Sequence, residues 1–263
     1  MPGNDAPNSG PNPPATSGPA ISVVVPVRNE AGNVAPLIGE IAAALQSALP
    51  ERAFEIVYVN DGSTDGTEKE LLGLMAQRPW LRQIKHETSC GQSAAIRTGV
   101  ISARAPVIAT IDGDGQNDPA FIPKLIAVLE QGAPGIGLVA GQRVGRKASG
   151  FKRLQSRIAN AVRGAVLKDG TRDTGCGLKA FRRDLFLALP YFDALHRFLP
   201  ALVRREGFDI GYVDVVDRPR HSGVSNYGFF DRLWVGILDL AGVWWLIRRK
   251  KRVAQSQEIT LAR

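Results

Sequence analysis

The sequence predicts an α/β fold with a doubly wound, mostly parallel sheet and helices on both of its faces. Short runs of β-branched and apolar residues alternate with segments of ten or more residues that have helical periodicity. Polar loops rich in Asp, Asn and Gly follow three of these runs. The 263 residues are enough for one such domain with a large buried core.

The first predicted strand is residues 21–27 (ISVVVPV), a β-branched run typical of a strand buried on both faces. Helical periodicity follows, with Pro36 in the first turn of the segment. The remaining strands are predicted at 54–59, 81–85, 107–111, from 138, and at 209–216. The helices between and after them are predicted at 34–49, from 67 to about 77, 91–102, 119–131 and around 195–202.

The overall composition limits the class of protein. A net charge of +8 indicates anionic partners, which could be phosphate groups, nucleic acid or an anionic membrane surface. Cys90 and Cys176 are too few for a disulfide framework and fit a reducing compartment. Residues 1–20 are rich in Pro, Gly, Asn and Ser and lack the pattern of a signal peptide, so we expect a disordered leader.

The acidic stretch 110–119 (TIDGDGQNDP) is the strongest candidate for a functional site. Asp112 and Asp114 would project towards the same side of an extended segment and repel each other unless a cation lies between them. Gln116 adds a third oxygen at the same spacing, and Gly113 allows a bulky ligand to approach the backbone. These oxygens suit Mg²⁺ or Mn²⁺ carrying substrate phosphates. The alternative is an ordinary surface turn, since Asp and Gly are common turn residues.

Three polar loops follow successive apolar strands: RNE at 28–30, NDGSTDG at 60–66 and DGDGQ at 112–116. In a parallel sheet the carboxyl ends of these strands lie along one edge, where ligands of α/β proteins bind. This coincidence favours a binding site over a surface turn.

The segments PVRNE (26–30), NDGSTDGT (60–67) and DGDGQNDP (112–119) resemble those of inverting family 2 glycosyltransferases with the GT-A fold. Within that family the chain is most similar to the dolichol-phosphate mannosyltransferase group and its bacterial polyprenyl-phosphate relatives, over roughly residues 21–245. The resemblance implies a metal-dependent enzyme on the cytoplasmic face of the membrane. Its donor would be a UDP- or GDP-sugar and its acceptor a polyprenyl phosphate.

The resemblance also implies roles for individual residues. Those assigned to the nucleotide and its phosphates are Pro26, Arg28, Glu30, Val59, Asp61, Asp112, Gly113, Arg218 and Arg220. The metal ligands would be Asp112, Asp114 and Gln116, and the residues that act in catalysis Asp112, Asp114 and Arg143, with Arg143 at the acceptor phosphate. From the residues alone, 60–67 could instead cap a helix and Glu30 could be an exposed charge.

Residues 143–172 contain nine Lys and Arg residues and one acidic residue, Asp169. This run is either a solvated helix face or a surface for a phosphate-bearing acceptor or anionic lipid. Its one aromatic residue, Phe151, argues against stacking on nucleic acid. Arg153 or Arg157 could provide a second contact to the acceptor phosphate.

The segment 173–184 (DTGCGLKAFRRD) and the loop 217–228 (DRPRHSGVSNYG) are also similar to family segments. We interpret Cys176 as a small packing residue and His196 as a structural residue rather than a general base. The loop would close over the donor phosphates. Asn226 stands where Lys is common, which leaves more of that role to Arg218 and Arg220.

Residues 229–247 are apolar but interrupted by Asp231, Arg232 and Asp239, so they are too short to span a membrane. We predict an amphipathic helix at the membrane interface, with Trp244 and Trp245 before the basic run 248–252. The alternative is a core helix with a solvated basic end. The predicted organisation is a leader (1–20), a catalytic domain (21–228), the interfacial helix with its basic end (229–252) and a tail (253–263).

Two alternatives to the phosphate acceptor remain open. An acceptor phosphate is already anionic at neutral pH and needs no strong base, whereas a sugar hydroxyl, as in polysaccharide or lipopolysaccharide synthesis, would need a carboxylate such as Asp173 or Asp193. A non-catalytic basic peripheral protein would not need its acidic loops at all. Neither the donor base, the sugar nor the oligomeric state follows from these residues.

Overall fold

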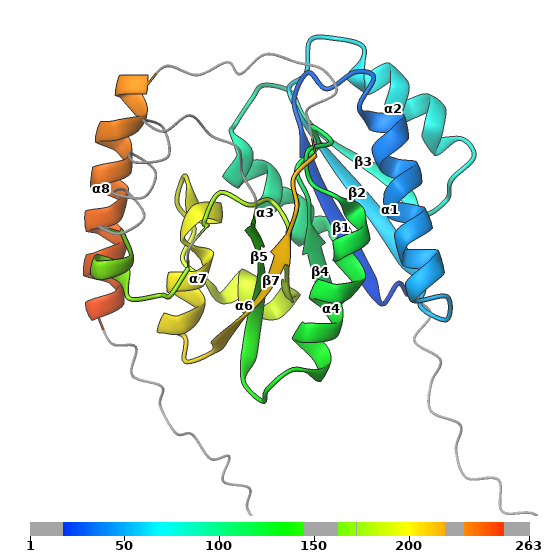
Figure 1. Ribbon diagram of the computed structural model, residues 1–263. Coiled ribbons are helices and arrows are strands. Elements are labelled where there is room, and N and C mark those ends of the chain that lie inside the picture. The colour runs from blue at the N-terminus through cyan, green and yellow to red at the C-terminus, as the bar shows by residue number, and fades with distance from the viewer. Residues whose placement is uncertain (1–17, 145–162, 172, 219–228, 250–263) are drawn as a thin grey trace, which may run out of the picture.

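The computed structural model describes residues 18–144, 163–171, 173–218 and 229–249. Within them, one seven-stranded sheet has the order β3-β2-β1-β4-β6-β5-β7 (Figure 1). The strands are β1 (Ile21–Val27), β2 (Phe54–Asp61), β3 (Leu81–His86), β4 (Val107–Thr110), β5 (Ile136–Arg143), β6 (Lys179–Arg182) and β7 (Asp209–Val215).

The helices alternate with these strands, as the sequence predicts. Those of the described residues are α1 (Val34–Ala48), α2 (Thr67–Met75), α3 (Gln92–Ser102), α4 (Ile122–Gln131), α6 (Arg183–Ala188), α7 (Leu195–Arg205) and α8 (Phe229–Arg248), with a 3₁₀ turn, η1, at Pro119–Phe121.

Strand β1 lies between β2 and β4 and pairs in parallel with both. Val24 is opposite Val57 on one side and Thr110 on the other. Val23, Val24 and Val25 are all fully buried, which explains the unbroken apolar run of this strand.

Helices cover both faces of the sheet (Figure 1). Side chains of α1, α2 and α4 form one hydrophobic core with the sheet, and those of α3, α6 and α7 form a second on the opposite face. Helix α8 packs beside α7 and contributes Val243 to the second core. The predicted doubly wound architecture is therefore confirmed.

Strand β6 runs antiparallel to both of its neighbours, β4 and β5. The sequence did not indicate this strand, because it has only four residues and lies between a glycine-containing loop and a helix. Its position matters for function, since it brings Lys179 beside Thr110 of β4.

Most predicted elements differ from the observed ones by one to three residues at one end, and two of these differences lie beside the site. Strand β2 continues through Asn60 and Asp61, because these residues pair with Lys85 and His86 of β3. The helix predicted from Pro119 begins as the 3₁₀ turn and becomes α-helical only at Ile122. The side chain of Asp118 accepts a hydrogen bond from the N–H of Ala120 and fixes this turn.

Helix α8 begins at Phe229 and ends at Arg248, within a residue of the predicted segment. Across the described ranges, no helix is both long and apolar enough to cross a membrane.

Candidate functional site

The three polar loops meet at the carboxyl edge of strands β1, β2 and β4, as predicted. They line a cavity of about 270 Å³. We call it the nucleotide cavity, after the ligand that the family resemblance implies. The start of α3 completes its wall. The lining residues are Pro26, Val27, Arg28, Glu30, Asp61, Gly91, Gln92, Ala95, Asp112, Gly113 and Asp114.

Hydrogen bonds between the loops after β1 and β2 fix the shape of this cavity. Asn29 has a left-handed backbone with φ of 56°, its N–H donates to Ser63 Oγ at 3.0 Å, and its side-chain oxygen accepts from the N–H of Thr64 at 2.8 Å. Asp65 accepts from the N–H of Ala31 at 3.1 Å and from that of Thr67 at 3.0 Å. Ser63, Thr64 and Asp65 therefore hold the β1 loop, a role that the sequence did not show. Asp65 also bonds to the start of α2, in line with the capping role that the sequence left open for this segment.

Asp112 and Asp114 both line the nucleotide cavity, just beyond the end of β4. Burial and the neighbouring charge of Asp114 raise the pKa of Asp112 to about 6, although Lys179 and Arg143 partly offset this rise. Gln92 Nε2 donates to Asp112 Oδ1 at 2.8 Å. Repulsion between two carboxylates with open space beside them is the feature expected of a divalent cation site with oxygen ligands. The donor set therefore fits Mg²⁺ or Mn²⁺.

Gln116, predicted as a third metal ligand, does not line the nucleotide cavity. Its backbone carbonyl accepts from the N–H of Arg218 at 2.7 Å, and its own N–H donates to Asp114 Oδ1 at 3.1 Å. Gln116 thus helps to orient Asp114 through its backbone. Binding of the metal by the Gln116 side chain stays a prediction.

The Asp61 carboxylate has an environment that the sequence did not reveal. Oδ1 accepts from the N–H of Cys90 at 2.8 Å and contacts His86 Nδ1 at 2.7 Å. Oδ2 accepts from Ser89 Oγ at 2.7 Å and from the N–H of Gly91 at 2.9 Å. These hydrogen bonds outweigh burial and lower the pKa of Asp61. The carboxylate therefore holds the segment from His86 to Gly91, which reaches the wall of the cavity at Gly91.

Asp61, His86 and Cys90 lie close enough together to offer ligands to a metal ion. The four hydrogen bonds of Asp61 already use both of its oxygens, and His86 Nε2 lies 2.9 Å from Thr98 Oγ1. The side chains of Asp61 and His86 and the backbone N–H of Cys90 form a hydrogen-bonded network, so Asp112 and Asp114 are the better metal site.

Arg143, predicted at the acceptor phosphate, lies at the end of β5 between two carboxylates. Its guanidinium donates to Asp173 from Nε at 2.5 Å and from Nη2 at 2.8 Å, and Nη1 lies 3.4 Å from Asp217. Burial raises the pKa of Asp173, but the hydrogen bonds that Arg143 donates to this carboxylate outweigh burial and lower the pKa. Asp173 is therefore a weak base, which disfavours it as the base for a hydroxyl acceptor.

Of the remaining predicted residues, those that the structure describes do not line the nucleotide cavity. Val59 is fully buried in β2, beside Ala95 of α3. Arg218 forms ion pairs with Glu40 at 2.7 Å and Asp118 at 2.6 Å. Arg220, Asn226, Arg153 and Arg157 are outside the described residues. The phosphate contacts assigned to these arginines stay predictions.

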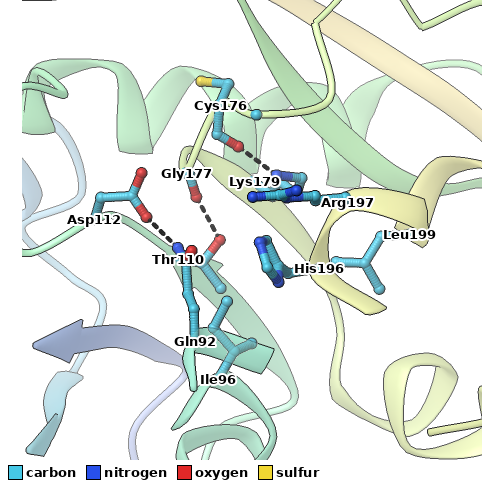
Figure 2. A pocket seen from close by; sticks show the side chains of 11 residues that line it. Gln92, Ile96, Thr110, Asp112, Cys176, Gly177, Lys179, His196, Arg197 and Leu199 are labelled. Carbon is cyan, nitrogen blue, oxygen red and sulfur yellow. Dashed lines mark hydrogen bonds between the residues drawn. The ribbon is translucent and has the colours of Figure 1, made fainter. Parts of the chain in front are cut away.

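A second, smaller cavity of about 90 Å³ lies behind Asp112, and we call it the inner cavity (Figure 2). It shares Gln92 and Asp112 with the nucleotide cavity. Its other lining residues come mainly from the segment before β6, from β6 and from α7. They are Ile96, Thr110, Gly175, Cys176, Gly177, Lys179, His196, Arg197 and Leu199.

Lys179 and Gln92 are the functional candidates that sequence reasoning missed. Lys179 is 4% exposed, and its ammonium group donates to the backbone carbonyl of Cys176 (Figure 2). Lys179 belongs to the short strand β6, and Gln92 begins a helix, so neither had a signal in the sequence. The prediction that Cys176 is a packing residue is supported by its 1% exposure and by a thiol pKa that burial raises to about 11.

His196 contacts Ser93 at the start of α3, with 2.7 Å between Nδ1 and the serine Oγ. Burial, with smaller contributions from Lys179 and Arg197, lowers the pKa of His196 to about 3. The ring is therefore neutral at physiological pH and lines the inner cavity.

Comparison with known proteins places these features in a family. Residues 22–189 match the family model described as glycosyl transferase family 2. The chain is 36% identical over 236 residues to the dodecaprenyl-phosphate galacturonate synthase of Rhizobium johnstonii, covering 88% of this chain and 68% of that protein. It is 32% identical over 210 residues to the undecaprenyl-phosphate 4-deoxy-4-formamido-L-arabinose transferase of Edwardsiella ictaluri, covering 79% and 63%. The chain thus spans about two thirds of these curated relatives.

Solved structures support the fold. Glucosyl-3-phosphoglycerate synthase from Mycobacterium tuberculosis, in complex with Mn²⁺, UDP and glucosyl-3-phosphoglycerate, superposes with a TM-score of 0.65 at 20% identity, covering 88% of this chain and 80% of that one. The same enzyme with Mg²⁺ and UDP gives 0.63 at 21% identity, covering 88% and 79%. At this identity the likeness concerns the fold alone, and it confirms the GT-A architecture.

Proposed function

Because the chain belongs to glycosyl transferase family 2, we propose that it transfers a sugar from a nucleoside-diphosphate sugar to a polyprenyl phosphate at a membrane surface. The observation that carries the proposal is the pair Asp112 and Asp114 at the carboxyl edge of the sheet, inside a cavity of about 270 Å³. The relatives named for dodecaprenyl- and undecaprenyl-phosphate support the lipid acceptor.

The nucleotide cavity supplies the groups that a nucleotide needs. Glu30 can accept hydrogen bonds from ribose or base, and Arg28 adds a cation at the same wall. Asp61, whose oxygens are already used by its four hydrogen bonds, would shape this wall rather than bind the nucleotide directly. The segment held by Asp61 includes Gly91, the residue before α3, so the positive end of that helix faces the cavity. A structural relative was solved in complex with UDP, so UDP-sugars are tested alongside GDP-sugars.

Asp114, with Asp112 beside it, would hold Mg²⁺ or Mn²⁺ against the donor diphosphate. The ion would supply positive charge to the leaving diphosphate as the glycosidic bond breaks. The raised pKa of Asp112 supports this assignment, since its cause is burial and carboxylate repulsion that a cation relieves. Gln92 would keep Asp112 in position through its 2.8 Å hydrogen bond.

The acceptor phosphate needs orientation more than deprotonation, because it is largely anionic at neutral pH. The ion pair of Asp173 with Arg143, at 2.5 Å, leaves this carboxylate poorly suited as a base. Asp193 is exposed and its Oδ1 accepts from the N–H of Ala194 at 2.8 Å, so it remains the candidate base if the acceptor is a hydroxyl.

Helix α8 would attach the enzyme to the cytoplasmic face of the membrane without crossing it. One side of the helix packs on α7 through Val243, while Ile237, Leu238 and Trp245 are 48%, 69% and 53% exposed. Arg248 lies over the ring of Trp244, 4.0 Å from its centroid. Exposed aromatic and aliphatic side chains beside arginines are typical of a helix at the interface of an anionic membrane.

The proposal is tested by measuring transfer of labelled sugar from UDP- and GDP-sugars into organic-extractable lipid, with polyprenyl phosphate and Mn²⁺. We expect the wild-type enzyme to label the lipid, and Asp114→Ala or a chelator to reduce labelling at least about 100-fold, as expected for loss of metal-dependent charge stabilisation. Asp214→Asn is the matched control, since Asp214 is an exposed carboxylate outside both cavities.

Donor binding without lipid labelling would point to a hydroxyl acceptor and to Asp193 as its base. Absence of nucleotide binding in the presence of metal would contradict the proposed function itself.

A further inference from the structure

The inner cavity is not needed to hold the nucleotide, yet it adjoins the nucleotide cavity through Gln92 and Asp112. Its walls come from α3, β4, the segment before β6, β6 and α7 (Figure 2). A volume of about 90 Å³ can take part of one sugar ring, but not a nucleotide. The side chains that line the inner cavity should therefore indicate which sugar the enzyme accepts.

Lys179 is the most unusual residue of this cavity. It is 4% exposed and comes from the central region of the sheet, where β6 lies between β4 and β5. The backbone carbonyl of Cys176 accepts one of its three N–H groups. Throughout the described residues, no carboxylate lies within ion-pair distance of Lys179. Buried charges in proteins are normally paired, so a buried ammonium group facing a cavity indicates that the ligand supplies the anion.

His196 provides a second donor. Ser93 is 2% exposed, and its Oγ already accepts from the backbone N–H of His196 at 3.3 Å. Among the described residues, His196 Nδ1 is the acceptor found for the serine hydroxyl proton, at 2.7 Å. This places the ring proton on Nε2, where it is available as a donor in the cavity wall.

Arg197 also lines the cavity (Figure 2). The Lys179 ammonium, the His196 Nε2–H and the Arg197 guanidinium can donate hydrogen bonds but cannot accept them. The carboxylate of the cavity, Asp112, already accepts a hydrogen bond from Gln92. The charge of Asp112 partly balances that of Lys179. With Arg197 the described lining of the cavity still has two cations against one carboxylate, and a neutral sugar hydroxyl would not balance the excess positive charge. A carboxylate accepts several charge-assisted hydrogen bonds and balances that charge.

We propose that the inner cavity binds the carboxylate of a hexuronic acid, so that the donor is a nucleoside-diphosphate uronate rather than a neutral hexose. Lys179 pairs with the carboxylate, and His196 donates to it from Nε2. This inference rests on the proposed function, because it assumes that the nucleotide of a sugar donor occupies the adjoining cavity.

The acceptor phosphate is the other possible source of an anion, but the location of the cavity favours the donor sugar. Asp112 and Gln92 form the boundary with the nucleotide cavity, so a sugar attached to the diphosphate lies next to the opening. Arg143, the residue expected at the acceptor phosphate, does not line the inner cavity. It lies near Gly175, where an added Cβ would be 3.1 Å from its Nη2.

The test is calorimetric titration of the full chain with UDP, UDP-galactose and UDP-galacturonate in the presence of Mn²⁺ and without acceptor lipid. We expect UDP-galacturonate to bind at least tenfold more tightly than UDP-galactose. Lys179→Met should remove most of this preference while changing the affinity for UDP less than threefold. Lys124→Met, an exposed lysine of α4, is the matched control and should leave all three affinities unchanged.

Equal binding of UDP-galactose and UDP-galacturonate to the wild-type protein would overturn this inference but not the proposed function. That measurement needs no variant, so it stands even if Lys179→Met fails to fold. An unchanged preference in Lys179→Met, with a raised KM for polyprenyl phosphate, would assign the cavity to the acceptor and also overturn it. Failure of the protein to bind UDP at all would instead contradict the proposed function.

Discussion

The carboxylate of Asp112 lies directly against the α-carbon of Gly177. A Cβ added to Gly177 would be 2.3 Å from the carboxyl carbon of Asp112 and 2.4 and 2.5 Å from its two oxygens. Thr110 Oγ1 donates to the carbonyl of Gly177 at 2.7 Å and fixes this approach (Figure 2). The absence of a side chain at Gly177 is therefore a condition for the position of the Asp112 carboxylate.

The first prediction concerns Gly177→Ala, which should displace the Asp112 carboxylate. We expect glycosyl transfer to fall at least about tenfold and the free energy of unfolding to fall by about 1–3 kcal/mol, the usual cost of overpacking. Steady-state transfer assays and urea unfolding measure the two effects.

Gly39→Ala is the control for this change. An added Cβ at Gly39 meets nothing within 4 Å, and the residue is an exposed position within α1. We expect a small gain in stability, about 0.5–1 kcal/mol, and unchanged transfer. Wild-type activity in Gly177→Ala would show that the position of Asp112 is not required.

The second prediction concerns Asp61→Asn. The substitution removes the negative charge of the carboxylate that accepts hydrogen bonds from the N–H groups of Cys90 and Gly91. The segment from His86 to Gly91 should therefore become less firmly held. We expect a loss of about 1–3 kcal/mol in stability and weaker nucleotide binding. Because the pKa of Asp61 is lowered on folding, its contribution is present above its ordinary pKa and is lost as the pH falls below it.

Calorimetry with UDP and urea unfolding at neutral pH measure the two effects. Glu68→Gln is the control, because it removes an exposed ion pair with Lys85 and should cost less than about 1 kcal/mol. Unchanged UDP affinity in Asp61→Asn would separate this network from the nucleotide site.

The third prediction concerns His196 and pH. Its pKa is about 6.5 in the unfolded chain and about 3 in the folded protein, so the unfolded state binds a proton that the folded state does not. The stability from the neutral ring is fully present above pH 6.5 and is lost as the pH falls from there towards 3. The slope is at most about 1.4 kcal/mol per pH unit.

Urea unfolding of the wild type and His196→Gln at pH 7.5 and pH 5.5 measures this effect. Glutamine does not titrate, so the wild type should lose about 1 kcal/mol more than the variant between the two pH values. Comparing each protein with itself removes the constant cost of the substitution. Equal losses in both proteins would show that His196 is protonated to the same extent in the folded and unfolded states.

The fourth prediction concerns the pair Arg143 and Asp173, which are 12% and 20% exposed. Asp173→Asn and Arg143→Gln should each reduce stability by about 1–3 kcal/mol, less than for a fully buried pair. Since the two side chains act together, the double variant should lose clearly less than the sum.

Transfer assays on the same four proteins test the role of Asp173 in catalysis. In the Arg143→Gln background, Asp173→Asn should change transfer by less than about threefold, because it no longer breaks an ion pair. A further loss of several hundredfold in that background would identify Asp173 as a general base instead.

The fifth prediction concerns the exposed side of α8. Replacing Trp244 and Trp245 by serine should weaken binding to vesicles that contain anionic lipid by at least about tenfold, given the apolar area removed. Flotation of the protein with vesicles measures the bound fraction. Leu72→Ser, at an exposed leucine of α2, is the control and should leave binding unchanged. Equal loss in both variants would show that α8 is not the membrane surface.

The sequence was sufficient to place most strands and helices, and the reasons are local. The run ISVVVPV of β1 has no polar interruption because both of its faces are buried. Strand β6 was missed because four residues show no periodicity and its antiparallel direction depends on pairing with β4 and β5. The end of β2 was placed two residues early because Asn60 and Asp61 are turn residues by type but strand residues by pairing.

By itself, the sequence determined that three polar loops follow parallel strands and that Asp112 and Asp114 lie among them, because the carboxyl ends of parallel strands share one edge of a sheet. Only the tertiary structure decided what surrounds these residues. The hydrogen bond from Cys90 to Asp61, the pairing of Arg143 with Asp173, and the hydrogen bond from Thr110 to Gly177 join residues that are 29, 30 and 67 positions apart. The pairing of β6 with β4 likewise brings Lys179 to the inner cavity. Such contacts depend on how the elements pack, and local sequence patterns do not record packing between distant segments.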